Sequence, residues 1–229
     1  MNELAPRDEV ARAVQRQMTL SGATSVDLDM RDVDPALFPN VVTALRQAGI
    51  DPERQLIPVA PAAHYMMGGI ATDAHGRATL AGLHAVGECS CTGLHGANRL
   101  ASNSLTECFV FGARAARSAV AEVAPDTAAV ESAVESSSTR PRAAKPRPIS
   151  AASRKALWRH AGLERDAAGL GELAADPHPL VRLIAECALA RTESRGAHQR
   201  RDFPERDPVF DGRHETIGAV GKASLQTWA

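Results

Sequence analysis

Aromatic side chains are scarce in this chain, at 3% of 229 residues. Proteins that bind single-stranded nucleic acid commonly stack its bases on aromatic rings, so this scarcity argues against such a platform. The chain also lacks an excess of charge of one sign, because its formal net charge is −1 at pH 7. No global electric field therefore favours nucleic acid or an anionic membrane surface. We expect no nucleic-acid partner.

Long apolar runs are missing as well. No segment approaches the roughly 18 apolar residues of a membrane span. The first residues, MNELAPRDEVAR, are charged and contain no apolar core of a signal peptide. These two features predict a cytoplasmic protein without a membrane partner.

Cysteine is too sparse for a disulfide framework, with four residues in the chain. Cys89 and Cys91 form a C-x-C pair, but no second pair follows at the spacing of a zinc site. We therefore predict reduced thiols and no metal site.

The remaining composition is that of a globular protein with one large or two small domains, at 44% hydrophobic and 23% charged residues. Periodicity in the first part predicts a helix over 9–20 capped by Asp8, and an edge strand over 26–30. A second amphipathic helix is predicted over 39–47, followed by an extended segment over 56–60.

Glycine, histidine and hydroxyl side chains are most concentrated between His64 and Ala116. Here the pattern predicts a β-hairpin over 69–80, a short buried strand over 82–88, and a helix from about Ser102 to Val120. Ligands of open α/β sheets bind beyond the carboxyl ends of the strands, which is where Glu88 would lie. The predicted fold class is α/β, with helices and strands mixed.

The last part of the chain changes in composition twice. Residues 123–150 are rich in Pro, Ser and Arg, which predicts a solvated linker or, alternatively, an anion-binding tail. Residues 151–201 have helical periodicity, and the tail from Arg201 is polar with little core of its own. GLGELA at 169–174 has dinucleotide-site spacing but no preceding strand, and RGAH at 195–198 suggests a glycine helix cap.

Some of these residues suit chemistry as well as packing. A helix that opens at Ser102, after a glycine-bearing loop, would present unpaired amides and positive partial charge to an anionic ligand. Arg99 in that loop has a planar fork that suits a carboxylate, and His64 could donate to an oxyanion. Each residue alone is more simply explained by an ordinary cap or a structural role.

Three motifs considered together identify a resemblance. HYMMGG, GLHAVGE and TGLHGANRLASNSLTE, supported by LAPRDEVARA and ESRGAH, resemble the fumarate reductase, succinate dehydrogenase and L-aspartate oxidase flavoprotein family. The motif TGLHGANRLASNSL is more similar to that of the L-aspartate oxidases than to that of the dehydrogenases.

The resemblance implies a domain order. Residues 1–62 would be the end of a capping domain, and 63–122 the closing segment of a Rossmann-like FAD-binding domain. Residues 123–150 would be a linker, and 151–229 a helical C-terminal domain with a polar tail. The chain would be a C-terminal portion without the glycine fingerprint that holds the FAD pyrophosphate, so we expect it to bind FAD weakly when alone.

The resemblance also implies an activity: FAD-dependent oxidation of L-aspartate to iminoaspartate, with oxygen or fumarate as acceptor, in de novo NAD biosynthesis. Arg7 would transfer the proton, and His64 and Arg99 would hold the substrate carboxylates with Ser102 close by. Partners would include quinolinate synthase and a chain that supplies the missing FAD-binding half.

The cofactor would contact three further positions. Glu88 matches an acidic residue that touches FAD, and Ser104 and Leu105 match the helix opening under the flavin ring. Met66 and Met67 depart from the family pattern, which has small or polar residues there.

Two alternatives remain open from the sequence. One is a succinate or fumarate oxidoreductase flavoprotein. The other is a truncated or split-gene chain without activity of its own, which acts as a partner subunit.

Overall fold

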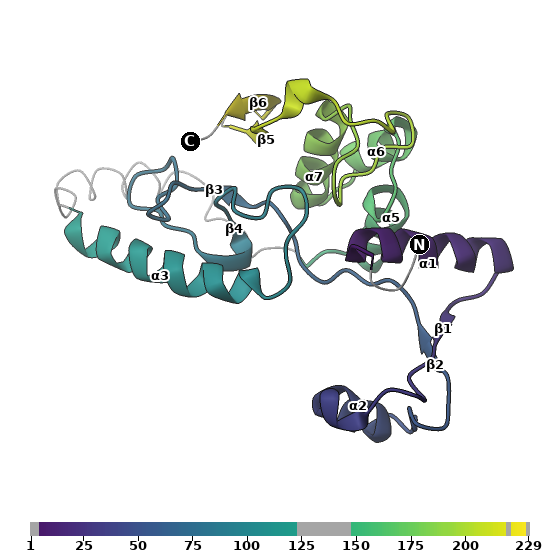
Figure 1. Ribbon diagram of the computed structural model, residues 1–229. Helices are drawn as coiled ribbons and strands as arrows, with labels where there is room; N and C mark the ends of the chain where they lie inside the picture. Colours follow the sequence, from purple (N-terminus) through teal and green to yellow (C-terminus); the bar gives the residue numbers. More distant parts are fainter. Residues whose placement is uncertain (1–4, 123–147, 219–220, 228–229) are drawn as a thin grey trace. The chain divides into compact units, whose positions relative to one another are not determined.

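The computed structural model describes residues 5–122, 148–218 and 221–227. The chain divides into two units, Met1–His64 and Tyr65–Ala229. Helices alternate with short two-stranded sheets along the chain, which confirms the α/β fold class (Figure 1). Most of the predicted linker, residues 123–147, lies outside the described residues.

Helix α1 (Arg7–Ser21) opens the first unit. It begins directly after Pro6 and ends at Ser21, and Gly22 follows as its C-cap with a φ of 68°, the left-handed conformation. The predicted cap at Asp8 is wrong, because Asp8 lies inside the first helical turn. Its carboxylate instead accepts a hydrogen bond of 2.9 Å from Arg12, four residues along the helix.

The rest of the first unit is a small antiparallel pair and a second helix. Strand β1 (Val26–Leu28) pairs with β2 (Ile57–Val59), so both predicted extended segments form, although each is shorter than expected. Between them lie the 3₁₀ turn η1 (Pro35–Leu37) and helix α2 (Pro39–Gln47). Helix α2 has the predicted bounds, since Pro39 is compatible only with a first helical turn.

The second unit begins with little regular strand. Strand β3 (Ile70–Ala71) pairs in parallel with β4 (Ser90–Cys91), and the predicted hairpin is reduced to one antiparallel bridge between Thr72 and Ala78. The predicted strand over 82–88 is wrong. Gly87 has a φ of 76° and starts the 3₁₀ turn η2 (Gly87–Cys89), which interrupts extended backbone before Glu88.

Helix α3 (Asn103–Ala121) follows, close to its predicted bounds, and is drawn in teal in Figure 1. It packs on η2. Within the described part of the chain, no helix is long and apolar enough to cross a bilayer.

Three helices build the largest apolar core: α5 (Ala151–Ala161), α6 (Ala167–Ala174) and α7 (Pro179–Ala190). Their buried contacts come from Leu170, Leu173, Val181, Ala185 and Ala188. GLGELA lies within α6, and two of its residues, Leu170 and Leu173, fill this core.

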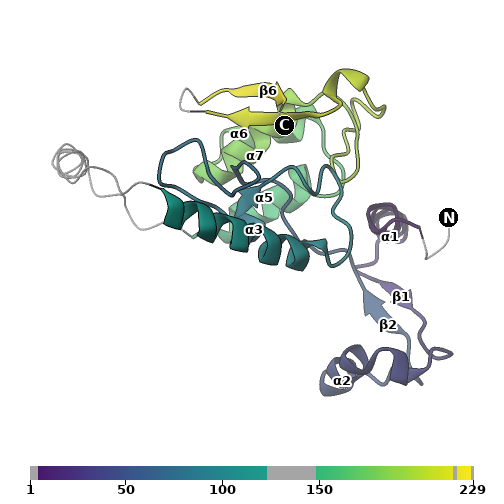
Figure 2. The same ribbon diagram turned by 60° about the vertical axis from the view of Figure 1, so that its left-hand side comes forward.

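The tail after α7 is more structured than predicted. Helix α7 stops at Ala190 and not near 201, and the chain continues through η3 (Pro208–Phe210) into an antiparallel hairpin of β5 (Arg213–Ile217) and β6 (Ala223–Thr227). This hairpin lies beside α7 (Figure 2). Phe210 is the one buried hydrophobic residue in the described part of this tail.

The side chain of Arg200 caps the C-terminal end of α7. The buried guanidinium of Arg200 donates to the carbonyl oxygens of Ala188 and Leu189 at 2.8 and 3.2 Å. Cations at a helix C-terminus stabilise the unpaired carbonyls and the negative end of the helix dipole. The sequence signal for this role is weak, because Arg200 lies ten residues beyond the helix.

Candidate functional site

Arg99 is the most unusual cation in the second unit. Its side chain is buried at 7% exposure. Nη1 donates to the Leu100 carbonyl oxygen at 3.2 Å and to Ser104 Oγ at 3.4 Å, whereas Nε is buried and has no partner among the described residues. No carboxylate in the described ranges forms an ion pair with it. A buried guanidinium without an anion is costly, so the arrangement suits an anionic ligand.

The ring of Tyr65 supports this guanidinium. Arg99 Cζ lies 4.6 Å from the ring centroid, within the range of a cation–π contact. The Tyr65 hydroxyl donates to Glu107 Oε2 at 3.3 Å. Burial, reinforced by the Glu107 charge, raises the pKa of Tyr65 to about 12, so the phenol stays protonated at neutral pH.

Glu107 is buried at 2% exposure on the first turns of α3. Its Oε1 accepts from Thr92 Oγ1 at 2.6 Å, and its Oε2 lies 2.8 Å from His95 Nε2. A buried carboxylate needs such donors to remain charged. One acidic side chain thus joins α3 to the loop that carries Arg99.

The amino end of α3 has an uncommon backbone. Ser102 has a φ of 65°, and its side chain caps no amide. It is the one non-glycine residue with positive φ in the described ranges. The Leu105 amide donates to the Ser102 carbonyl at 3.1 Å, whereas the Ser104 amide has no described partner. That amide and the helix dipole favour an electron-rich group at this end.

Glu88 lies in η2 and is exposed. Its Oε1 accepts a hydrogen bond from the Met66 amide at 2.9 Å. Gly69 comes so close to the Cys89 carbonyl that any Cβ there would overlap it. These contacts bring the HYMMGG and GLHAVGE segments together.

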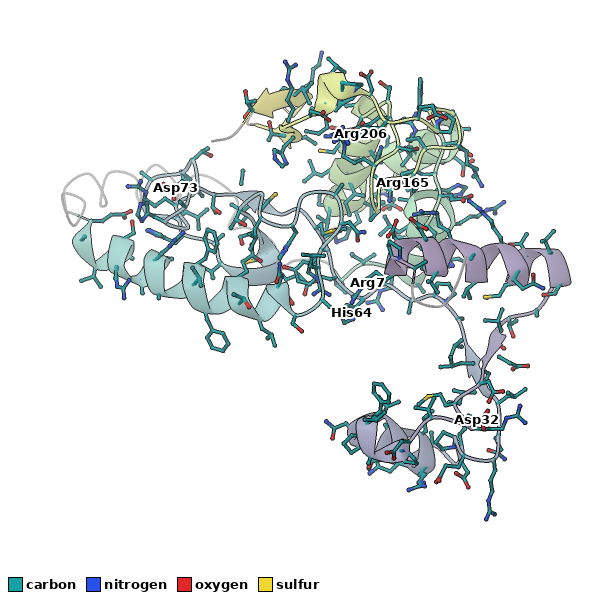
Figure 3. All side chains as sticks on the ribbon, in the orientation of Figure 1. Arg7, Asp32, His64, Asp73, Arg165 and Arg206 are labelled. Atoms are coloured by element: carbon teal, nitrogen blue, oxygen red, sulfur yellow. The ribbon has the colours of Figure 1, made fainter. Side chains whose placement is uncertain are left out.

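Arg7 and His64 belong to the first unit (Figure 3). Both side chains are exposed, Arg7 at the start of α1 and His64 on the extended segment after β2. The other predicted residues lie in the second unit, where Arg99 and Ser104 are in contact. His64 directly precedes Tyr65, the residue that stacks on Arg99.

Sequence reasoning missed Tyr65, Thr92, His95 and Glu107. Each stands inside a motif that was singled out, but only the fold shows that they meet. The available signal was Glu107 itself, an acidic residue three positions after Ser104 and so on the same helical face.

The loop before Arg99 is also held by the C-terminal part of the chain. The Ala197 amide donates to the Ala97 carbonyl oxygen at 2.7 Å. Gly196 has a φ of 54° and lies against the Ala97 backbone, where no Cβ would fit. The expectation that Gly196 caps a helix is wrong, since α7 ends several residues earlier. Because glycine has no side chain, Gly196 allows the backbone to pack closely against the loop that carries Arg99.

Two family models match this chain. An FAD binding domain model covers residues 1–105, and a fumarate reductase flavoprotein C-terminal model covers residues 178–222. The helix terminus and the acidic turn described above fit that cofactor. The chain is therefore of the FAD-dependent flavoprotein class.

Similar proteins narrow the class further. The L-aspartate oxidase of Rhodospirillum rubrum is 43% identical over 237 residues, which cover 92% of this chain and 82% of that protein. That of Caulobacter vibrioides is 48% identical over 90% of this chain. The chain belongs to the L-aspartate oxidase family. It spans 42% of the Caulobacter protein and 44% of the Agrobacterium fabrum protein.

Solved structures agree on the fold. A mutant of E. coli quinol fumarate reductase FrdA superposes with a TM-score of 0.72 at 31% identity, over 96% of this chain and 48% of that chain. A quinol–fumarate reductase with menaquinol molecules gives a TM-score of 0.75.

Proposed function

We propose that this chain carries the dicarboxylate clamp and part of the flavin contact surface for oxidation of L-aspartate to iminoaspartate. The observation that carries the proposal is Arg99, a buried guanidinium with unused donors and no described counterion. A dicarboxylate must be held at fixed points for its C–H bond to face the oxidant. FAD, when bound, supplies the two-electron acceptor.

Arg99 would bind one carboxylate. Because Nη1 is already tied to Leu100 and Ser104, the orientation of the fork is set before the ligand arrives. A fork fixed in this way binds a carboxylate with less loss of side-chain entropy than a free arginine does. Ser102, exposed at the start of α3, would add a hydroxyl next to the clamp.

His64 and Arg7 would have the two remaining roles that the family resemblance implies. His64 is exposed and can donate to the second carboxylate. Arg7 would take the substrate proton, a role that needs other cations nearby, because the pKa of a guanidinium is normally above 12.

Three residues would contact the cofactor. The free amide of Ser104 and the positive end of α3, which includes Leu105, would stabilise negative charge that reduction places on the flavin. Glu88 would accept a hydrogen bond from a cofactor hydroxyl.

The proposed reaction supplies iminoaspartate for de novo NAD biosynthesis in the cytoplasm, with oxygen or fumarate as final acceptor. Iminoaspartate hydrolyses readily, so an enzyme that consumes it, such as quinolinate synthase, is the expected neighbour. A second chain that supplies the rest of the flavin domain is the other proposed partner.

Substrate assays decide between this function and its alternative. The structural similarity to quinol fumarate reductase favours succinate as the second candidate. The chain would be tested alone and mixed with a polypeptide that carries the remaining flavin domain of a relative. L-Aspartate should yield imine and peroxide, and succinate should not reduce an artificial acceptor. Succinate oxidation without aspartate turnover would establish the second candidate.

A further inference from the structure

A polar network lies behind the proposed carboxylate clamp and touches no bulk solvent at its centre. It consists of Glu107, His95, Thr92 and Tyr65. Glu107 is 2% exposed, and the His95 side chain that it contacts is 9% exposed. None of these residues has a role in the proposed function.

The geometry connects the network to Arg99 by two routes. Helix α3 carries Ser104 and Glu107 on one face, one turn apart. Ser104 contacts the guanidinium directly, with Oγ 3.4 Å from Nη1. Glu107 acts through Tyr65, whose hydroxyl it binds and whose ring lies 4.6 Å from Arg99 Cζ.

His95 anchors the loop from the other side. Its Nε2 lies 2.8 Å from Glu107 Oε2, and its ring meets the Tyr65 ring edge-on at 5.4 Å. This short contact suits the His95 tautomer with a proton on Nε2, which would donate to the carboxylate oxygen. These two contacts of His95 hold the loop that carries Arg99 against α3.

We infer that Glu107 is a positioning residue: it holds the Tyr65 ring beneath the Arg99 guanidinium and the His95 loop against α3. This deepens the proposed function, on which it rests for the ligand. The class of ligand served is a small dicarboxylate, because the guanidinium so fixed has no described counterion of its own.

The single tyrosine of the chain makes the network directly observable. Tyrosinate absorbance therefore reports Tyr65 alone. In the folded full chain the phenol should ionise near pH 12, against about 10 in denaturant. In Glu107→Gln, which keeps the side-chain volume, this gap should narrow without closing, since burial also contributes. Glu205→Gln is the control, because it removes a negative charge from an exposed position. Tyr65 in this variant should titrate as it does in the wild type.

A second readout concerns the clamp. With FAD and the complementary flavin-domain polypeptide present, Glu107→Gln should raise the KM for L-aspartate on the order of tenfold, because small displacements of substrate-positioning groups are costly. Tyr65→Phe keeps the ring but removes the same hydrogen bond to Glu107, so it should also raise KM, although less, because the His95–Glu107 contact remains. If Glu107→Gln fails to fold, an unchanged KM in Tyr65→Phe would overturn the positioning role.

The two readouts separate the hypotheses. A tyrosine titration that is the same in wild type and Glu107→Gln would overturn the network, whatever the turnover. Equal KM values in wild type and Glu107→Gln would overturn the positioning role. A narrowed titration gap in a protein that never oxidises L-aspartate would support the network and reject the proposed function.

Discussion

The backbone amide of Ala197 donates a hydrogen bond of 2.7 Å to the carbonyl oxygen of Ala97, two residues before Arg99. The loop after α7 is thereby attached to the loop of the proposed carboxylate clamp. Residues about a hundred positions apart in sequence share one contact, so a change in the C-terminal part should reach the site.

Gly196 tests this attachment. Gly196→Ala should lower the free energy of unfolding by about 2–4 kcal/mol, because the new Cβ meets the Ala97 backbone and the φ of 54° is unfavourable. Gly212 has a φ of 65° and open space around it. Gly212→Ala should therefore cost only about 1 kcal/mol, measured by the same urea titration. Equal losses would show that the Ala97 contact contributes nothing.

Thr92 tests whether Glu107 depends on its donors. Thr92→Val removes the 2.6 Å hydrogen bond to the buried carboxylate and should destabilise the chain by about 1.5–3 kcal/mol. Thr72 is the matched control, since its hydroxyl is buried and has no described partner. Thr72→Val should be neutral or slightly stabilising in chemical denaturation. A larger loss for Thr72→Val would contradict the assignment.

His198 should make the C-terminal region sensitive to acid. Burial, with the charge of Arg165, lowers its pKa to about 4 from 6.5. Its Nε2 lies 3.1 Å from the Arg191 carbonyl oxygen, which suits the neutral ring with that nitrogen protonated.

The sign of the effect follows from linkage. The folded state binds fewer protons than the unfolded state between these two values, so the stabilisation present above pH 6.5 is lost as pH falls toward 4. The full loss is on the order of 3 kcal/mol. His198→Asn should flatten this part of the stability–pH curve, and His75→Asn, an exposed substitution, should leave it unchanged. An unaltered slope in His198→Asn would rule out His198 as the cause.

Local patterns predicted some elements well. Helix α2 has the expected bounds because Pro39 and the apolar spacing act within nine residues. The prediction of a helix cap at Asp8 was wrong because Pro6 already determines where α1 starts. The strand expected over 82–88 failed because hydrophobicity does not reveal that Gly87 adopts a φ of 76°.

Contacts between residues distant in sequence could not be predicted from the local sequence pattern. Ile70 and Ser90 pair in parallel, and Tyr65 meets Glu107 across 42 positions. The resemblance selected Arg99 and Ser104, which the structure brings together, because the motif is continuous along the chain. The residues behind them act through the fold, and their chemistry alone does not distinguish them from ordinary polar residues.

Arg99 provides the most direct test of the central claim that the second unit carries the dicarboxylate clamp. The measurement is L-aspartate-dependent loss of flavin absorbance, in the chain mixed with FAD and the complementary flavin-domain polypeptide. Arg99→Ala should abolish this loss while bound flavin, measured after gel filtration, equals that of the wild type. Arg99→Lys should also fail, since a lysine lacks the planar fork. Wild-type rates of flavin reduction in Arg99→Ala would contradict the account.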